Sequence, residues 1–273
     1  KMMKKKVNNS IVLVLLAALI ALLSACGSKQ PTQNLPVIVS TEQQSDTPTE
    51  VIVNTPSVAL LRNFDCTVVT DVSQSECRAL VVFYNATNGD GWLNKSGWLE
   101  SPTVSNWYGV TVYEGHVSGL DLSKNQLSGI LPIELGDLTY LGYLGLNDNQ
   151  LTGNIPSELG KLTNLRGLAL SNNQLSGNIP ASLGSLTKLT SLYLSSNQFT
   201  GSVPSELGNL VNLESLNIHN NPLSGSLPVS LVNLTSLQNF SFFGTSLCEP
   251  PTSDFQEWKS TVTQWYATGV VCQ

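Results

Sequence analysis

The hydrophobic residues in the central part of the chain recur with a period of 24 residues. Segments 117–140, 141–164, 165–188, 189–212 and 213–236 follow one another without a gap and place apolar residues at matching positions. In segment 165–188 the pattern comprises Leu165, Leu168, Leu170, Asn173, Leu175, Gly177, Ile179, Pro180, Leu183, Gly184 and Leu186. A sixth copy begins with Leu237, Phe240 and Phe242 and ends at Cys248. Such a period predicts a solenoid of stacked repeats.

Each repeat is expected to hold a strand and a turn toward a short helix. The alternation in Leu168, Ala169 and Leu170 has the period of a strand with one buried face. Proline fits the first turn of a helix or an extended edge, because it has no N–H group to satisfy. One repeat alone buries too little apolar surface to offset its ordering entropy. Neighbouring repeats must therefore share a core and pair their strands into a parallel sheet.

An asparagine stands at the same place in every full repeat, where the chain turns inward after the strand. Its amide has two donors and an acceptor, so it can bridge the backbones of successive turns. We expect a structural ladder at these positions rather than a binding site. The ladder comprises Asn125, Asn149, Asn173, Asn197 and Asn221.

The stretch from leucine through glycine to proline in each repeat has a known counterpart. With its prolines at Pro132, Pro156, Pro180, Pro204 and Pro228, the segment 117–248 resembles the plant-type leucine-rich repeats of receptor-like kinases and polygalacturonase-inhibiting proteins. This resemblance implies an α/β solenoid. It would be a right-handed leucine-rich-repeat superhelix with a concave parallel β-sheet and a helical cap at each end.

The N-terminal cap is predicted at residues 58–116. Ser73 and Glu76 form a potential capping box ahead of a helix whose inward face would carry Cys77, Leu80, Val81, Phe83 and Tyr84. Trp92 and Trp98 follow, and the segment from Trp107 to Val112 resembles the one that precedes the first repeat in plant-type proteins. The cysteine of that segment is missing here, so a disulfide between Cys66 and Cys77 is expected to replace the family's bridge.

The C-terminal cap is predicted at residues 249–273. Ser253 and Gln256 offer a second capping box, and helical spacing places Phe255, Trp258, Val262, Trp265 and Tyr266 on one helix face. These aromatic residues are expected to cover the last repeat. The alternative is a sugar-binding stripe.

The cysteines favour an oxidising compartment. Apart from Cys26, one pair lies on each side of the repeats, so the simplest pairing is Cys66 with Cys77 and Cys248 with Cys272. A zinc site is the alternative, but no spacing of Cys and His supports it.

The first 25 residues are predicted to be a lipoprotein signal peptide. Four lysines precede an apolar run at 11–23 that is too short to span a bilayer comfortably. The residues before Cys26 resemble a lipobox, which implies an acylated Cys26 and attachment to a membrane in the bacterial cell envelope, on the extracytoplasmic side. An ordinary secretory signal is the alternative. Residues 26–57 are rich in small polar residues and proline, which predicts a lipid-anchored flexible tether.

The charge of the chain argues against nucleic acid as a partner. The formal charge is −6, from 13 basic and 19 acidic residues. Loss of residues 1–25 would remove four lysines and no acidic residue, which changes the charge to −10. Such a surface repels nucleic acid and anionic lipid headgroups.

Nothing in the sequence predicts an enzyme, a cofactor or a metal site. The only histidines, His116 and His219, are about a hundred residues apart. No nucleophile-elbow, zinc-protease or phosphate-loop pattern occurs. Asn85, Asn88 and Asp90 faintly resemble a calcium loop, but their spacing favours a turn.

The outward side chains of the strands provide the best prediction of a ligand-binding site. Aligned repeats give outward columns of mostly small or polar residues. The large exceptions are Tyr143, Arg166, Tyr193, Glu214 and His219. Aromatic and arginine side chains are typical of binding hot spots. The alternative is a featureless solvated sheet.

The leading hypothesis is a surface-tethered binding module that captures a protein, peptide or glycan ligand on its concave face. Solenoid curvature supplies an extended surface for such a ligand. One alternative is an inhibitor or regulator of a partner enzyme, as the resemblance to polygalacturonase inhibitors implies. Another is a structural or adhesion protein of the envelope without a defined pocket.

Overall fold

The computed structural model describes residues 63–273, which belong to one compact unit, Thr55–Gln273. The predicted signal peptide, Cys26 and the predicted tether lie outside the described residues. Within 63–273, neither helix has the length and apolar character needed to cross a bilayer.

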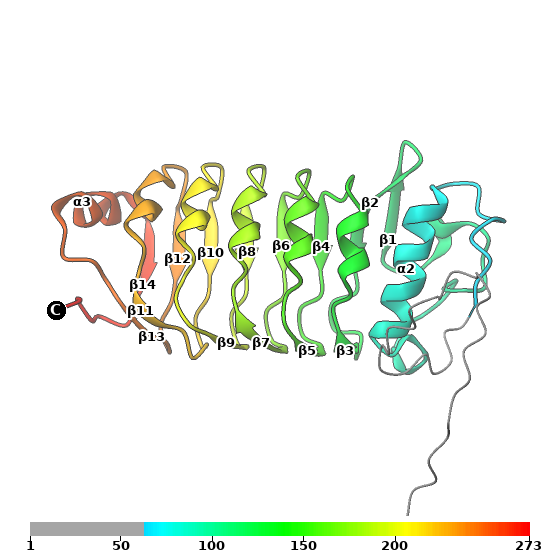
Figure 1. Ribbon diagram of the computed structural model, residues 1–273, viewed down its shortest axis with the longest axis horizontal. Helices are drawn as coiled ribbons and strands as arrows, with labels where there is room; N and C mark the ends of the chain where they lie inside the picture. The colour runs from blue at the N-terminus through cyan, green and yellow to red at the C-terminus, as the bar shows by residue number, and fades with distance from the viewer. Residues whose placement is uncertain (1–62) are drawn as a thin grey trace, which may run out of the picture. The chain divides into compact units, whose positions relative to one another are not determined.

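Each repeat forms a strand, a second short strand and a 3-10 helix (Figure 1). Two α-helices, α2 and α3, lie at opposite ends of the row of repeats. The helical segments are α2 (Gln74–Ala86), η1 (Gly89–Gly91), η2 (Val104–Asn106), η3 (Ile133–Asp137), η4 (Ser157–Lys161), η5 (Ala181–Ser185), η6 (Ser205–Asn209), η7 (Val229–Asn233) and α3 (Ser253–Thr261).

The first strand of every repeat joins one large sheet of eight strands. Its order is β1 (Val110–Tyr113), β2 (His116–Asp121), β4 (Tyr143–Gly145), β6 (Gly167–Ala169), β8 (Ser191–Tyr193), β10 (Ser215–Asn217), β12 (Asn239–Ser241) and β14 (Gln264–Tyr266). β1 and β2 are antiparallel, and all later pairs are parallel. From β2 to β12 each residue pairs with the one 24 positions later, so the predicted period is the register of the sheet.

The sequence analysis did not predict a second set of short strands, most of which follow the ladder asparagines. β3 (Ser128–Ile130), β5 (Gln150–Gly153), β7 (Gln174–Asn178) and β9 (Gln198–Thr200) form one parallel sheet, and β11 (Ser224–Ser226) pairs with β13 (Ser246–Cys248). Most of their side chains are polar and no strand has more than one fully buried residue, so the alternation that marks a strand is too short to recognise.

The leucines of the repeat form a continuous core. Leu165, Leu168, Leu170 and Leu175 have no exposed surface, and their equivalents in the neighbouring repeats are also buried. Tight packing of the helical side explains the repeated glycine in that segment. A Cβ atom on Gly184 would lie 2.3 Å from the carbonyl oxygen of Glu206 in the next repeat. A larger residue would therefore force successive 3-10 helices apart.

The hydrogen bonds expected of the asparagine ladder are present. The Asn173 side chain donates from Nδ2 to the carbonyl oxygens of Leu146 and Leu170, at 2.9 and 3.1 Å, and accepts at Oδ1 from the Leu151 N–H at 3.0 Å. Asn149, Asn197 and Asn221 make equivalent bonds. Asn125 bonds instead to the backbone of Asn94, which ties the first repeat to the cap. The amides of the four later ladder residues thus satisfy backbone groups of two turns at once.

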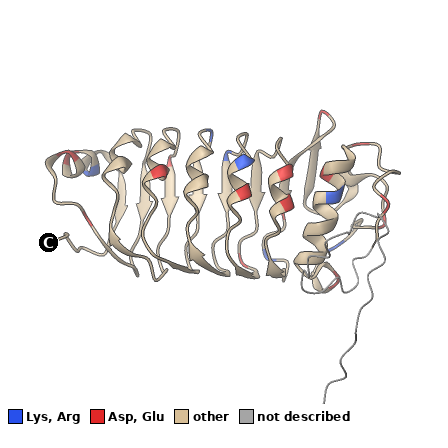
Figure 2. Ribbon diagram, viewed as in Figure 1, with Lys and Arg blue, Asp and Glu red and all other residues tan. Residues whose placement is uncertain are grey.

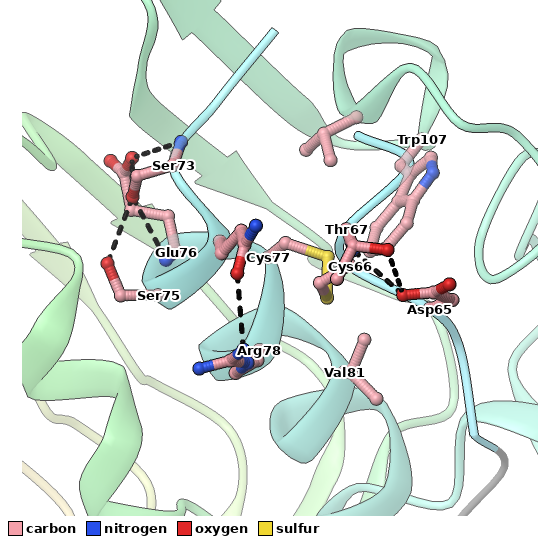
Figure 3. Close-up of a disulfide and its surroundings, with 12 residues drawn as sticks. Asp65, Cys66, Thr67, Ser73, Ser75, Glu76, Cys77, Arg78, Val81 and Trp107 are labelled. Atoms are coloured by element: carbon pink, nitrogen blue, oxygen red, sulfur yellow. Dashed lines mark hydrogen bonds between the residues drawn. A yellow bond between two sulfur atoms is a disulfide. The ribbon is translucent and has the colours of Figure 1, made fainter. Parts of the chain in front are cut away.

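The N-terminal cap has the predicted helix and disulfide. Ser73 and Glu76 form the capping box at the start of α2, and Cys66 is bonded to Cys77 (Figure 3). Cys77, Leu80, Phe83 and Tyr84 are buried, and Val81 is partly buried against the same core. Trp92, Trp98 and Trp107 are packed together behind the helix.

The predicted C-terminal cap is partly wrong. α3 starts at Ser253, its N-cap residue is Thr252, and no side chain caps it. Gln256 instead donates to the Pro250 carbonyl oxygen. The helix ends at Thr261, so Trp265 and Tyr266 lie on strand β14, which pairs with β12. The open edge of a sheet offers unpaired N–H and C=O groups, and pairing them outweighs a helical pattern of aromatic residues.

Side chains around Glu249 hold β14 in place. The buried Glu249 carboxylate accepts a hydrogen bond from the Trp265 indole N–H at 3.0 Å and forms an ion pair with Lys259 of α3. The Trp265 ring packs against Phe240, with ring centroids 5.1 Å apart. The predicted Cys248–Cys272 disulfide closes the segment that contains α3 and β14.

Replacing Asn173 by alanine should lower the free energy of unfolding by about 1–3 kcal/mol, because the Leu151 N–H and the Leu146 carbonyl lose a partner in a protected position. Chemical denaturation followed by circular dichroism would measure the loss. The exposed Asn209 in η6 provides the matched control, for which we expect little change. Equal stability of the two variants would contradict a stabilising role for the ladder.

Candidate functional site

The outward columns expected from the repeats are true rows across the large sheet. One row runs through Gly119, Tyr143, Gly167, Ser191 and Ser215, and the next through Asp121, Gly145, Ala169, Tyr193 and Asn217. Asp121 is the only Asp, Glu, Lys or Arg residue within the eight strands of the large sheet. Along the repeats, many of the charged residues are on or beside the 3-10 helices (Figure 2). The strands of this sheet are therefore nearly free of charge, and the exposed Arg166 and Glu214 directly precede β6 and β10.

The five predicted ligand-binding residues do not form one cluster. Arg166 and Glu214 are exposed and precede β6 and β10, two repeats apart in the same row. Tyr143 lies nearer the N-terminal end of the sheet. Tyr193 and His219 line a common pocket toward the C-terminal end.

Tyr143 covers two glycines of the sheet. A Cβ atom on Gly145 or on Gly167 would lie 2.7 Å from the Tyr143 ring, so both glycines make room for it. Burial raises the pKa of the Tyr143 phenol, and the negative charge of Asp121 raises this pKa further. The phenol is therefore a neutral group that rests against the sheet, and 41% of the residue is exposed.

The pocket toward the C-terminal end, here called the C-terminal sheet pocket, has a volume of about 300 Å³. Eight residues from β8, β10, β12, β14 and the loops after β10 and β12 line it: Tyr193, Ser215, Asn217, His219, Asn239, Ser241, Phe243 and Tyr266. Sheet register orders Tyr193, Asn217, Ser241 and Tyr266 in one row. Two tyrosines thus flank a floor of one amide and one hydroxyl group.

His219 stacks on Phe243 at one side of this pocket. Their ring centroids are 4.4 Å apart and their planes are 12° from parallel. Burial lowers the pKa of His219, and its Nδ1 atom is buried without a hydrogen-bond partner. The imidazole is therefore neutral at pH 7. No lining residue of the C-terminal sheet pocket carries a formal charge.

Four lining residues escaped the sequence analysis. Asn239, Ser241 and Phe243 belong to the sixth, degenerate repeat, where the outward columns were not continued. They stand 24 positions after Ser215, Asn217 and His219, so extending the columns by one repeat would have found them. Tyr266 gave no such signal, because α3 interrupts the repeat and β14 follows β12 with a different spacing.

The other histidine belongs to the N-terminal cap. His116 stacks on Tyr140 with ring centroids 3.5 Å apart, and its Nδ1 atom lies 3.4 Å from the Glu76 carboxylate. Glu76 is buried and also accepts hydrogen bonds from Ser73 and from the Val117 N–H. These contacts join the cap helix to the first repeat.

The loop that faintly resembled a calcium site is a turn. Asn88 adopts a left-handed conformation before η1, and Asp90 accepts a hydrogen bond from the Tyr84 hydroxyl group. Within residues 63–273, no group of three or more His, Cys, Asp or Glu side chains is arranged to hold a metal ion.

Several solved structures are similar to this chain. The ectodomain of the receptor kinase SOBIR1 from Arabidopsis thaliana is 30% identical, with a TM-score of 0.57 over 67% of this chain and 98% of the other. The ectodomain of GASSHO1/SCHENGEN3 from the same plant, in complex with CASPARIAN STRIP INTEGRITY FACTOR 2, is 31% identical, with a TM-score of 0.64 over 70% and 23% of the two chains.

A third similar structure is the Arabidopsis receptor kinase HAESA in complex with an IDA peptide hormone ligand. It is 28% identical, with a TM-score of 0.54, and the match covers 68% of this chain and 36% of the other. This chain thus spans about a quarter to a third of the two receptors that were solved with a ligand. No curated protein shows significant sequence similarity to it.

The family model described as "Leucine-rich repeat region" matches residues 117–260, which is more than half of the chain. The match includes β3 to β13 and all of β2 except His116, and the similar structures have the same fold. The chain belongs to the leucine-rich-repeat family.

Proposed function

We propose that this protein is a binding module that captures a protein, peptide or glycan ligand on the open face of the large sheet. The C-terminal sheet pocket carries this proposal, because it gathers aromatic and polar side chains from four strands in one place. The complex of HAESA with a peptide hormone supports a ligand-binding role for this kind of solenoid. Of the five residues predicted from the sequence, Tyr193 and His219 are the ones we assign to the pocket.

The proposed location is the extracytoplasmic side of a bacterial membrane. Both disulfides suit an oxidising compartment. Acyl chains on Cys26 would attach the chain to the membrane. A tether of about thirty residues would reach roughly 30 Å on average, which would lift the repeats clear of the headgroups.

Affinity capture tests the binding site. The full chain, purified in a detergent without sugar headgroups, is used as bait with a native envelope extract, and bound proteins and glycans are both analysed. We expect a saturable partner that the parent retains and that a Tyr193→Ala/Tyr266→Ala variant loses, because truncation of aromatic contacts in a binding site costs much of the affinity.

A Tyr143→Ala/Arg166→Ala variant of equal thermal stability is the matched control, since these residues share the face but not the pocket. It should bind as the parent does. Equal capture by all three proteins would place the site elsewhere. No capture by any of them would favour a structural role in the envelope, and inhibition of a captured enzyme would identify the protein as an enzyme regulator.

Stability should depend on pH through His219. Because burial lowers its pKa, the folded protein binds the proton less tightly than the unfolded chain does. The stability linked to the neutral imidazole is present above the unfolded pKa of about 6.5 and is lost as the pH falls through the folded pKa. From about pH 7.5 to about pH 5, the melting temperature of the parent should fall more than that of a His219→Gln variant. Parallel pH profiles in calorimetry would contradict this linkage.

Replacing Cys26 by serine should abolish lipid attachment, because only the thiol accepts the acyl group. Mass spectrometry of the mature protein from a bacterial host should find a lipid-modified N-terminus at position 26 in the parent, and the variant should lack this modification and leave the membrane fraction. A parent that is cleaved but carries no lipid would indicate an ordinary secretory signal.

A further inference from the structure

The C-terminal sheet pocket differs chemically from the rest of the sheet. At the equivalent places in the preceding repeats, the row through the pocket floor holds the small residues Gly145 and Ala169. In the pocket it holds Asn217 and Ser241. After Asp121 at the N-terminal end of the row, amide and aliphatic hydroxyl side chains enter it only between the two flanking tyrosines, Tyr193 and Tyr266.

These polar groups have no partner within the described protein. The side chains of Asn217, Asn239 and Ser241 form no hydrogen bond with any group in residues 63–273, whereas the ladder amide of Asn221 uses both its donor and its acceptor atoms. An amide has donors and an acceptor, and a hydroxyl group has both functions. The pocket floor thus offers unused hydrogen-bonding capacity of both kinds.

The walls of the pocket are aromatic and partly exposed. Tyr266 is 52% exposed and Phe243 is 41% exposed. Tyr193 and Tyr266 are separated by three strand spacings, or roughly 14 Å along the sheet. The volume of about 300 Å³ is at the lower end for small-ligand sites, which suits about one or two sugar rings.

We propose that the C-terminal sheet pocket binds a neutral saccharide, an inference that rests on the ligand-binding function proposed above. A pyranose ring has apolar C–H faces and a rim of hydroxyl groups that both donate and accept. The flanking aromatic side chains match the faces, and the amide and hydroxyl groups match the rim. A charged peptide terminus would find no counter-charge among the lining residues, and Glu214 beside Ser215 disfavours acidic sugars.

The test uses isothermal titration calorimetry of the full chain with a panel of neutral oligosaccharides of glucose, mannose, galactose and N-acetylglucosamine, in a detergent without sugar headgroups. We expect at least one of them to bind with a dissociation constant below about 10 mM. Tyr266→Ala and Asn217→Ala should each weaken that binding on the order of tenfold. Tyr143→Ala, on the same face outside the pocket, should leave it unchanged.

Ionic strength separates neutral recognition from charge attraction. Affinity for the neutral sugar should be nearly the same at low and high salt, and the corresponding uronate should bind more weakly. Failure of every neutral sugar to bind, retention of binding in Tyr266→Ala and Asn217→Ala, or preference for the uronate would overturn the inference. If the envelope partner is a protein whose capture requires Tyr193 and Tyr266 and is not reduced by any neutral sugar, the saccharide inference fails while the proposed binding function stands.

Discussion

The stacking of each 24-residue turn on the next is the contact on which the other features of this protein depend. A single turn has its leucines on one side and no second layer to cover them. The next turn supplies that layer, and the ladder asparagine joins the two backbones, as Asn173 does between Leu146 and Leu170. Identical neighbours are needed for both contacts, so the inward positions of the repeat vary little while the outward positions are free to vary.

That freedom has different results at different places on the sheet. Tyr143 lies over Gly145 and Gly167, and the small residues beneath it allow the ring to settle on the backbone. Further along the row, Asn217 and Ser241 separate Tyr193 from Tyr266, so the aromatic rings flank a polar floor. Large side chains alone therefore do not mark a site on a solenoid. Whether a large side chain contributes to a binding site depends on which residues occupy the same row on the next two strands.

The fold was largely predictable because the sequence contains five full copies of the repeat motif. The period specified the register, the buried leucines and the position of each ladder asparagine, and the four cysteines other than Cys26 indicated both disulfides. Local pattern was sufficient at the N-terminal cap too, where Ser73 and Glu76 satisfy the first turn of α2 between themselves. These features rest on contacts between residues whose spacing is visible along the chain.

The C-terminal cap and the pocket residue Tyr266 were not predictable in the same way. Phe255, Trp258 and Trp265 have helical spacing, yet Trp265 lies on strand β14, which pairs with the otherwise free edge of β12. The strand conformation is favoured by unpaired backbone groups of β12, and the sequence around Trp265 gives no sign of them. Tyr266 enters the pocket only as the neighbour of Trp265 on this added strand.

The C-terminal cap therefore does two things with one set of contacts. Trp265 covers the end of the core, where it packs on Phe240 and is held by Glu249. Alternation along β14 then turns the next residue, Tyr266, to the opposite face of the sheet, where it becomes a wall of the pocket. The Cys248–Cys272 disulfide closes the loop that brings β14 to this edge. The repeat motif does not specify Tyr266, which the C-terminal cap adds at the end of the solenoid. The pocket lies at this end because Tyr266 forms one of its walls.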